Sequence, residues 1–180
     1  MTRVVLGIDP GTTTGLAVWD LTDRQLLKVE SFTILQAMQQ VLIWRDVSEL
    51  VLVIFEDARI TRLGGGSTFG KKERLQGVGS IKRDCAIWEE FLTSHAIAFE
   101  AKKARTTKVE AKPFEQLTGW TGKTNNHARD AAMIVHGLNE PIVNAKLLAL
   151  KDASARTHQA GPAHPRRRTG YSRRRRNSPN

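Results

Sequence analysis

The sequence has few of the residues that secreted or membrane proteins need. A single cysteine among 180 residues excludes an internal disulfide and a cysteine-rich zinc site. No apolar run approaches the roughly 18 residues of a membrane-spanning helix. The N-terminal segment also lacks the apolar stretch ending in small residues that marks a signal peptide. We therefore expect a cytoplasmic protein that does not engage a membrane.

Acidic residues are a minority: 18 Asp and Glu are outnumbered by 28 Lys and Arg, giving a formal net charge of +10. Most of the excess lies in residues 152–180, which hold eight arginines and one aspartate. Ser, Ala, Gly and Pro dominate the rest of this segment, so we expect a disordered tail with little to bury. Residues 1–151 carry the apolar residues of one globular domain. The basic tail predicts a polyanionic partner, most simply nucleic acid.

Apolar runs predict five β-strands. The run at 3–9 ends at a Pro-Gly turn, and the β-like runs at 14–19 and 25–33 extend it into a three-stranded meander. The run at 50–55 is uninterruptedly apolar, as in a central strand covered on both faces. A short fifth strand is expected at 96–99.

Helical periodicity predicts the remaining elements. A helix should cover 34–46, and a second should cover 108–117 with a break near Pro113. The last expected helix covers 126–138. Four apolar residues mark one face of a further helix and give the only cysteine a packing role: Ile81, Cys85, Trp88 and Leu92. Together the pattern predicts an α/β fold with a mixed sheet flanked by helices.

Two carboxylates follow strands that a crossover connection would place side by side. Asp9 ends the first strand and Glu56 follows the fourth, so both would lie at the edge where open α/β sheets hold their sites. The last helix offers His127 and Asp130 on one face. Because crowded carboxylates repel each other without a cation, the cluster predicts divalent metal ions. Two such ions about 4 Å apart can activate water and stabilise the leaving oxygen of a phosphodiester.

Small residues on the opposite face of that helix would let it approach the sheet closely, which is how Asp130 could reach Asp9. These residues are Ala128, Ala131, Ala132 and Val135. Asp57 should point to the other face of the sheet from Glu56, since side chains alternate along a strand. We expect it to be structural or solvated.

Three motifs together resemble the RuvC family of Holliday-junction resolvases, and its phage-encoded relatives in particular: GIDPGTTTG at 7–15, FEDA at 55–58 and HARDAA at 127–132. The resemblance extends over residues 1–140. It implies an RNase H-like fold with a five-stranded mixed sheet, and a homodimer that cuts two opposed strands of a four-way DNA junction. A phage-encoded member would act in the host cytoplasm.

The resemblance also assigns the site. Asp9, Glu56 and Asp130 correspond to the catalytic, metal-binding carboxylates, with Mg²⁺ as the cofactor, two ions per active site, and Mn²⁺ as a substitute. His127 would be a fourth ligand or a proton-transfer group. Residues 1–151 would form the nuclease domain, followed by the Arg-rich tail at 152–180, which is not expected of a compact bacterial RuvC.

A glycine-rich basic segment at 59–77 is expected to form a mobile loop. Basic side chains there would contact phosphates, and an aromatic ring would stack on an unpaired base. The candidate DNA-binding residues are Arg59, Arg62, Phe69, Lys71, Lys72 and Arg74. The alternative is an ordinary solvated loop.

Other functions stay open. A nonenzymatic, architectural junction-binding protein would need only the basic loop and tail, although binding a polyanion gains nothing from gathered carboxylates. A fork or flap nuclease, or an RNA-processing nuclease, could use the same fold. An actin-like ATPase needs two such domains, and the chain is long enough for one. The helix around 81–92 is one possible dimer interface.

Overall fold

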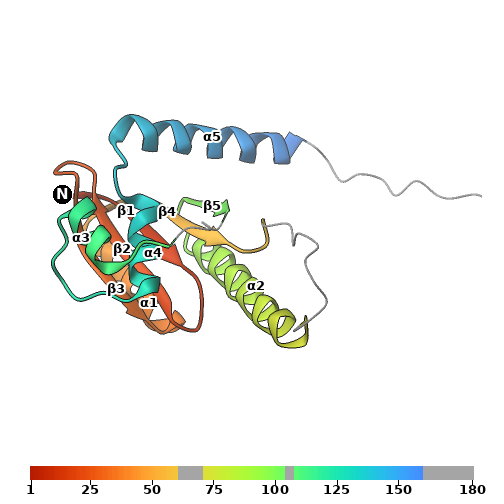
Figure 1. Ribbon diagram of the computed structural model, residues 1–180. Coiled ribbons are helices and arrows are strands. Elements are labelled where there is room, and N and C mark those ends of the chain that lie inside the picture. The colour runs from red at the N-terminus through yellow and green to blue at the C-terminus, as the bar shows by residue number, and fades with distance from the viewer. Residues whose placement is uncertain (61–70, 104–107, 160–180) are drawn as a thin grey trace, which may run out of the picture.

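The computed structural model describes residues 1–60, 71–103 and 108–159, with the backbone alone at 71–78 and 157–159. Five strands form one sheet (Figure 1): β1 (Arg3–Asp9), β2 (Thr14–Asp20), β3 (Gln25–Phe32), β4 (Glu49–Asp57) and β5 (Phe99–Lys103). The helices of the described residues are α1 (Ile34–Val47), α2 (Lys71–Ser94), α3 (Ala111–Thr118), α4 (Asn126–Val135) and α5 (Glu140–Gln159). None of these helices is long and apolar enough to cross a membrane.

The strand order is β3-β2-β1-β4-β5. Strands β1, β2 and β3 form the expected antiparallel meander, and β4 runs parallel to both β1 and β5. This five-stranded mixed sheet with flanking helices confirms the expected RNase H-like fold class. Since Ile8 pairs with Phe55, Asp9 and Glu56 each follow the same rung of the parallel β1–β4 pair. They therefore lie at one edge of the sheet.

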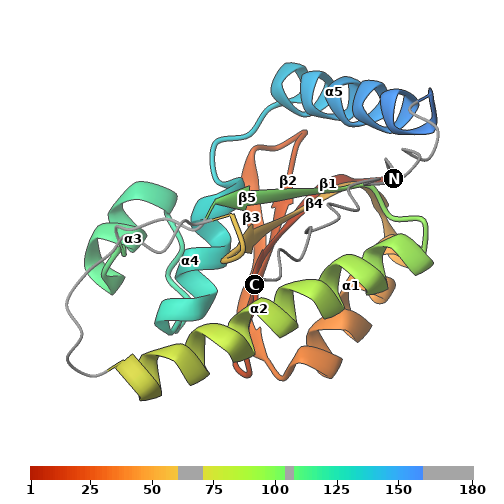
Figure 2. The same cartoon turned by 90° about the vertical axis from the view of Figure 1, so that its right-hand side faces the viewer.

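Helices cover both faces of the sheet (Figure 2). Helices α1 and α2 pack on one face against Val4, Leu6 and Ile8 of β1, while α4, α3 and part of α5 cover the other. Gly7, which lies between Leu6 and Ile8 in β1, faces α4 on the opposite side of the sheet. Because side chains alternate along a strand, Asp9 points to the same face as Gly7, toward α4.

Helix α2 differs from two expectations. It begins at Lys71, so the C-terminal part of the predicted loop at 59–77 is helical, since tertiary context outweighs the weak helix preference of its glycines. Its residues Cys85, Trp88 and Leu92 are fully buried against the sheet. This confirms the packing role of Cys85. The three buried side chains cannot form a dimer interface, but Ile81 is 41% exposed, so an interface along α2 stays a prediction.

Two shorter elements begin later than predicted. Residues 96 and 97 donate backbone hydrogen bonds to the end of α2, and Ala96 has a positive φ of 53°, so β5 starts at Phe99. Helix α3 starts at Ala111. Pro113 thus lies in its first turn, where a missing N–H breaks no helical hydrogen bond, and does not interrupt the helix.

Helix α5 was not predicted. Helix α4 ends at Val135 rather than at 138, and Gly137, at a φ of +83°, turns the chain into α5. Val143 is buried, and Lys146 Nζ donates to Glu100 Oε2 of β5 at 2.6 Å. Because α5 continues to Gln159, residues 152–159 are helical where disorder was expected. Residues 160–180 lie outside the described residues.

Helix α4 lies very close to β1 and β2, as its small residues predict. A Cβ atom added at Gly7 would come within 2.2 Å of the Ala131 carbonyl oxygen, and one at Gly15 within 1.9 Å of the His127 carbonyl oxygen. Both distances are far below any van der Waals contact. The two glycines therefore set how deeply α4 can sit on the sheet.

We expect Gly15→Ala to lower the free energy of unfolding by about 2 kcal/mol or more, because the methyl group must push α4 away from β2. Chemical denaturation measures the change. Gly79→Ala is the matched control, since a Cβ there meets open space in α2 and should be neutral or stabilising. Equal stability of the two variants would contradict the close packing.

Candidate active site

Asp9 and His127 form the centre of the candidate site. His127 Nδ1 lies 2.8 Å from Asp9 Oδ2, and the side chains are 43% and 16% exposed, respectively. When Asp9 is ionised, the Nδ1–H donates to it, which leaves Nε2 of this half-exposed ring available to solvent or substrate. Two residues that lie 118 positions apart in the sequence are thus in contact at the end of β1.

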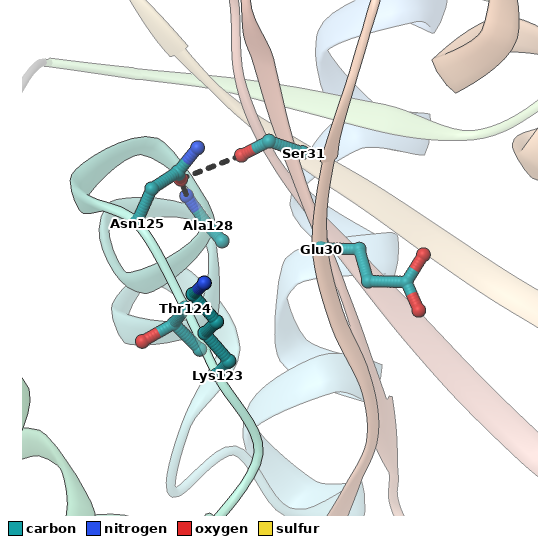
Figure 3. A pocket seen from close by; sticks show the side chains of 6 residues that line it. All are labelled: Glu30, Ser31, Lys123, Thr124, Asn125 and Ala128. Carbon is teal, nitrogen blue, oxygen red and sulfur yellow. Dashed lines mark hydrogen bonds between the residues drawn. The ribbon is translucent and has the colours of Figure 1, made fainter.

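The position of His127 is fixed by the start of α4. Asn125 is the N-cap, and its side-chain oxygen accepts from the Ala128 backbone N–H at 2.9 Å and from the Ser31 hydroxyl at 2.7 Å (Figure 3). The second bond ties α4 to β3. A pocket of about 280 Å³ lies at this junction, lined by Glu30, Ser31, Lys123, Thr124, Asn125 and Ala128.

The electrostatics of Asp9 reflect burial among charged neighbours. Burial raises the pKa of Asp9 above its usual 3.8, and the negative charge of Asp130 adds to the rise. The hydrogen bond and charge of His127, and the charge of Lys108, lower this pKa without offsetting the rise. Asp9 is therefore a carboxylate whose negative charge is costly in this setting, as expected for a group that a cation would stabilise.

Asp130 has a cationic neighbour that sequence reasoning missed. Lys108 Nζ lies 3.3 Å from Asp130 Oδ2. The buried Arg129 holds this region in place: its Nε donates to the Val109 carbonyl at 2.8 Å and its Nη1 to the Thr124 carbonyl at 3.2 Å. The guanidinium group thus ties the chain on both sides of α3 to the first turn of α4. The only sequence feature that could have pointed to this contact is Arg129 itself, an arginine within the HARDAA motif.

Glu56 lies at the C-terminal end of β4, 9% exposed. Strand alternation directs it to the α4 face, because Ile54 packs with the α4 core. Among the described residues, however, no three His, Cys, Asp or Glu side chains form a group that could hold a metal ion. The expected convergence of Asp9, Glu56, His127 and Asp130 is thus only partial, and the metal-binding role of each stays a prediction.

Asp57 lies on the opposite face, as alternation predicts, and is buried. Arg59 Nη2 lies 2.7 Å from Asp57 Oδ2 and 2.6 Å from Glu89 Oε2. Burial acts to raise the pKa of Asp57, but the hydrogen bonds and charge of Arg59 hold it below 3.8. This network ties the end of β4 to α2 and gives Arg59 a structural role, while its predicted contact with DNA stays a prediction.

The other predicted DNA-binding residues are not placed. Arg62 and Phe69 lie outside the described residues, and the side chains of Lys71, Lys72 and Arg74 are likewise not described. Their contact with DNA stays a prediction.

Comparisons with known proteins give a fold-level likeness. No family model matches the chain, and no curated protein matches it. A structure of Thermus thermophilus RuvC in complex with a Holliday junction substrate is similar at a TM-score of 0.42 and 18% identity, over 72% of this chain and 87% of that one. A second Thermus thermophilus RuvC structure gives a TM-score of 0.40 and 15% identity, over 71% and 88%.

We expect Arg59→Ala to destabilise the protein by about 1–3 kcal/mol at pH 7, because the buried Asp57 carboxylate loses its guanidinium donors and keeps the backbone N–H of residue 59. Since the folded-state pKa of Asp57 is lowered, the stabilisation is complete above the unfolded value near 3.8 and is lost as the pH falls through the folded value. The difference between variant and parent should therefore shrink below pH 3.8.

Urea unfolding at several pH values measures this. Arg45→Ala is the control, because it removes an exposed pair with Asp46 that should contribute less than about 1 kcal/mol. Equal losses for the two arginines would show that the Asp57 network is not structural.

Proposed function

We propose that this chain is a metal-dependent, structure-selective endonuclease that resolves branched DNA, four-way junctions in particular, by phosphodiester hydrolysis. One observation carries the proposal. Asp9 at the end of β1 contacts His127 of α4 and is repelled by the charge of Asp130, in an RNase H-like sheet whose β4 carries Glu56 at the same edge. These are the residues of the three motifs that resemble the RuvC family.

The donor set fits a hard divalent cation. Three carboxylates and one imidazole suit Mg²⁺ or Mn²⁺, and Asp9 is a buried carboxylate whose charge is disfavoured in the absence of added positive charge. Asp9, Glu56, Asp130 and His127 would hold the metal. Bound there, it would supply Lewis-acid activation of water and stabilisation of the leaving oxygen.

The chain's own groups would contribute in distinct ways. Asp9 orients the His127 ring through Nδ1, so the ring can take a proton from water or return one to a leaving oxygen at Nε2. Lys108, beside Asp130 and 59% exposed, adds positive charge where a phosphate would approach. The capped N-terminus of α4 favours an anion in the same region.

A nonenzymatic junction-binding protein is the second candidate, because the net charge of +10 alone would bind DNA. A buried, disfavoured carboxylate at the sheet edge has no use in that role and favours the enzyme. Fork or flap cleavage and RNA processing are narrower variants of the same chemistry. The homodimer and the phage origin belong to this proposal too, with an interface other than the buried face of α2.

Asp9→Asn should lower the cleavage rate by at least about a hundredfold and leave DNA binding intact, because the amide keeps the shape of the side chain but loses its charge. The assay compares a labelled four-way junction, a fork and a linear duplex in Mg²⁺ and in Mn²⁺. Asp23→Asn, an exposed carboxylate in the β2–β3 turn, is the control and should cut as the parent does.

Junction-selective cutting by parent and control alone would support the proposal. Equal cutting of forks would favour a general branched-DNA nuclease. Tight binding by all three proteins without cutting would favour the architectural protein.

Removing residues 160–180 should weaken junction binding at low salt and reduce its salt dependence. This segment holds seven arginines, and each phosphate contact contributes roughly 0.9 to the slope of log K against log salt. Fluorescence anisotropy between about 50 and 200 mM salt measures the slope. The truncation keeps all of α5, and an unchanged slope would mean that the tail does not contact DNA.

A further inference from the structure

A second pocket, of about 270 Å³, lies between the loop that follows β1 and one side of α2. Its described lining residues are Pro10, Gly11, Thr12, Thr13, Ser80, Ile81, Asp84 and His127. Because His127 lines this pocket and also contacts Asp9, the pocket adjoins the candidate active site. None of the three sequence motifs contains Ser80, Ile81 or Asp84.

Asp84 is the unexplained group in this pocket. The residue is 5% exposed, and its Oδ2 is buried without a hydrogen-bond partner. The exposed Arg83 is its one ion-pair partner in the part of the chain that the structure describes, and Arg83 Nη2 lies 3.8 Å from the other oxygen, too far for a hydrogen bond. Buried polar atoms in native proteins nearly always have partners. Since Asp84 lines the pocket, a ligand bound there could bring the donor that this carboxylate lacks among the described residues.

The position of Asp84 is fixed by the helix that carries it. The next residue, Cys85, and Trp88 one turn further along α2 are both fully buried against the sheet. The carboxylate is thus held rigidly at the pocket and does not sample solvent as a surface aspartate would. A rigid acceptor of this kind can discriminate among ligands.

The lining chemistry defines the ligand. No Lys or Arg is among the described lining residues, and the buried carboxylate would repel a phosphate. Hydroxyls of Thr12, Thr13 and Ser80 can donate or accept, and Ile81 and Pro10 supply apolar surface. A planar nucleobase fits this mixture, because it combines apolar faces with polar edges. Carboxylates read the exocyclic amino groups of bases, which donate two N–H bonds.

We propose that this pocket receives one unpaired nucleobase bearing an exocyclic amino group, next to the phosphodiester that is cut, and that Asp84 accepts the hydrogen bond from that amino group. The inference rests on the proposed nuclease function and adds a residue that selects the base. Guanine, adenine and cytosine meet the requirement, whereas thymine lacks the amino group.

The test uses four-way junctions that differ only in the nucleotides at the branch point. The parent protein should cut junctions with amino-bearing bases there about tenfold faster than junctions with thymine. Replacing guanine by hypoxanthine, or adenine by purine, removes only the amino group and should cost a similar factor. Asp84→Asn should reduce these differences to less than about twofold, whereas Glu90→Gln, an exposed carboxylate on the same helix, should retain them.

Binding to the same junctions, measured by anisotropy in Ca²⁺, separates the two proposals. If the parent cuts DNA without regard to the amino group, or if Asp84→Asn keeps the preference, the base pocket is wrong and the nuclease stands. If no junction is cut, the nuclease proposal fails, and an amino-group preference in binding alone decides the pocket. Should Asp84→Asn not fold, as circular dichroism would show, the hypoxanthine and purine substitutions decide with the parent protein.

Discussion

The depth at which α4 sits on the sheet is the constraint on which the rest of the site depends. Gly7 and Gly15 leave no Cβ where the carbonyl oxygens of Ala131 and His127 approach the strands. With any larger residue at either position the helix would have to move outward, taking His127 and Asp130 with it. The contact between Asp9 and His127 spans only 2.8 Å, so a displacement of an ångström would weaken it severely. The absence of a Cβ at Gly7 and Gly15 thus allows the contact between Asp9 and His127 at the end of β1.

Strand alternation divides the two adjacent acids of β4 between two tasks. Glu56 belongs to the α4 face with the candidate site, whereas Asp57 faces α2 and is held by Arg59, which also pairs with Glu89 of α2. The pKa shifts of the two aspartates on these faces run in opposite directions for this reason. Asp57 has a bidentate cationic partner that outweighs its burial, whereas the imidazole of His127 and the charge of Lys108 do not offset the burial of Asp9 and its repulsion by Asp130. The first arrangement stabilises the fold, and the second leaves a charge that the protein itself does not neutralise fully.

The first four strands, the pairing of the fourth with the first and the position of Asp9 could be predicted, because they rest on apolar runs that end in a carboxylate and on the rule for crossover connections. Helix α5 was missed because its sequence has a weak apolar face and is held by distant partners, Lys146 with Glu100 and Arg3 with Glu140. The partners of Arg59 and Asp130 were missed for the same reason, since an ion pair between distant positions leaves no periodic trace. Gly7 and Gly15 did carry a signal, because glycine inside a strand often marks a close backbone approach.

The hydrogen-bond donors beside the acids explain how these acids can share one edge of the sheet. His127 beside Asp9 and Lys108 beside Asp130 each place a donor against a carboxylate, which lowers the cost of gathering negative charge. Both side chains are substantially exposed, so both contacts can break and re-form at low cost, unlike the buried Arg129 clamp behind them. The backbone behind the site is thus held by the buried Arg129, while the groups that lie against the carboxylates, His127 and Lys108, are exposed. Under the proposed function, a cation bound at these carboxylates would compete with His127 and Lys108 for them, and the imidazole and ammonium groups would then be free to contact a phosphate.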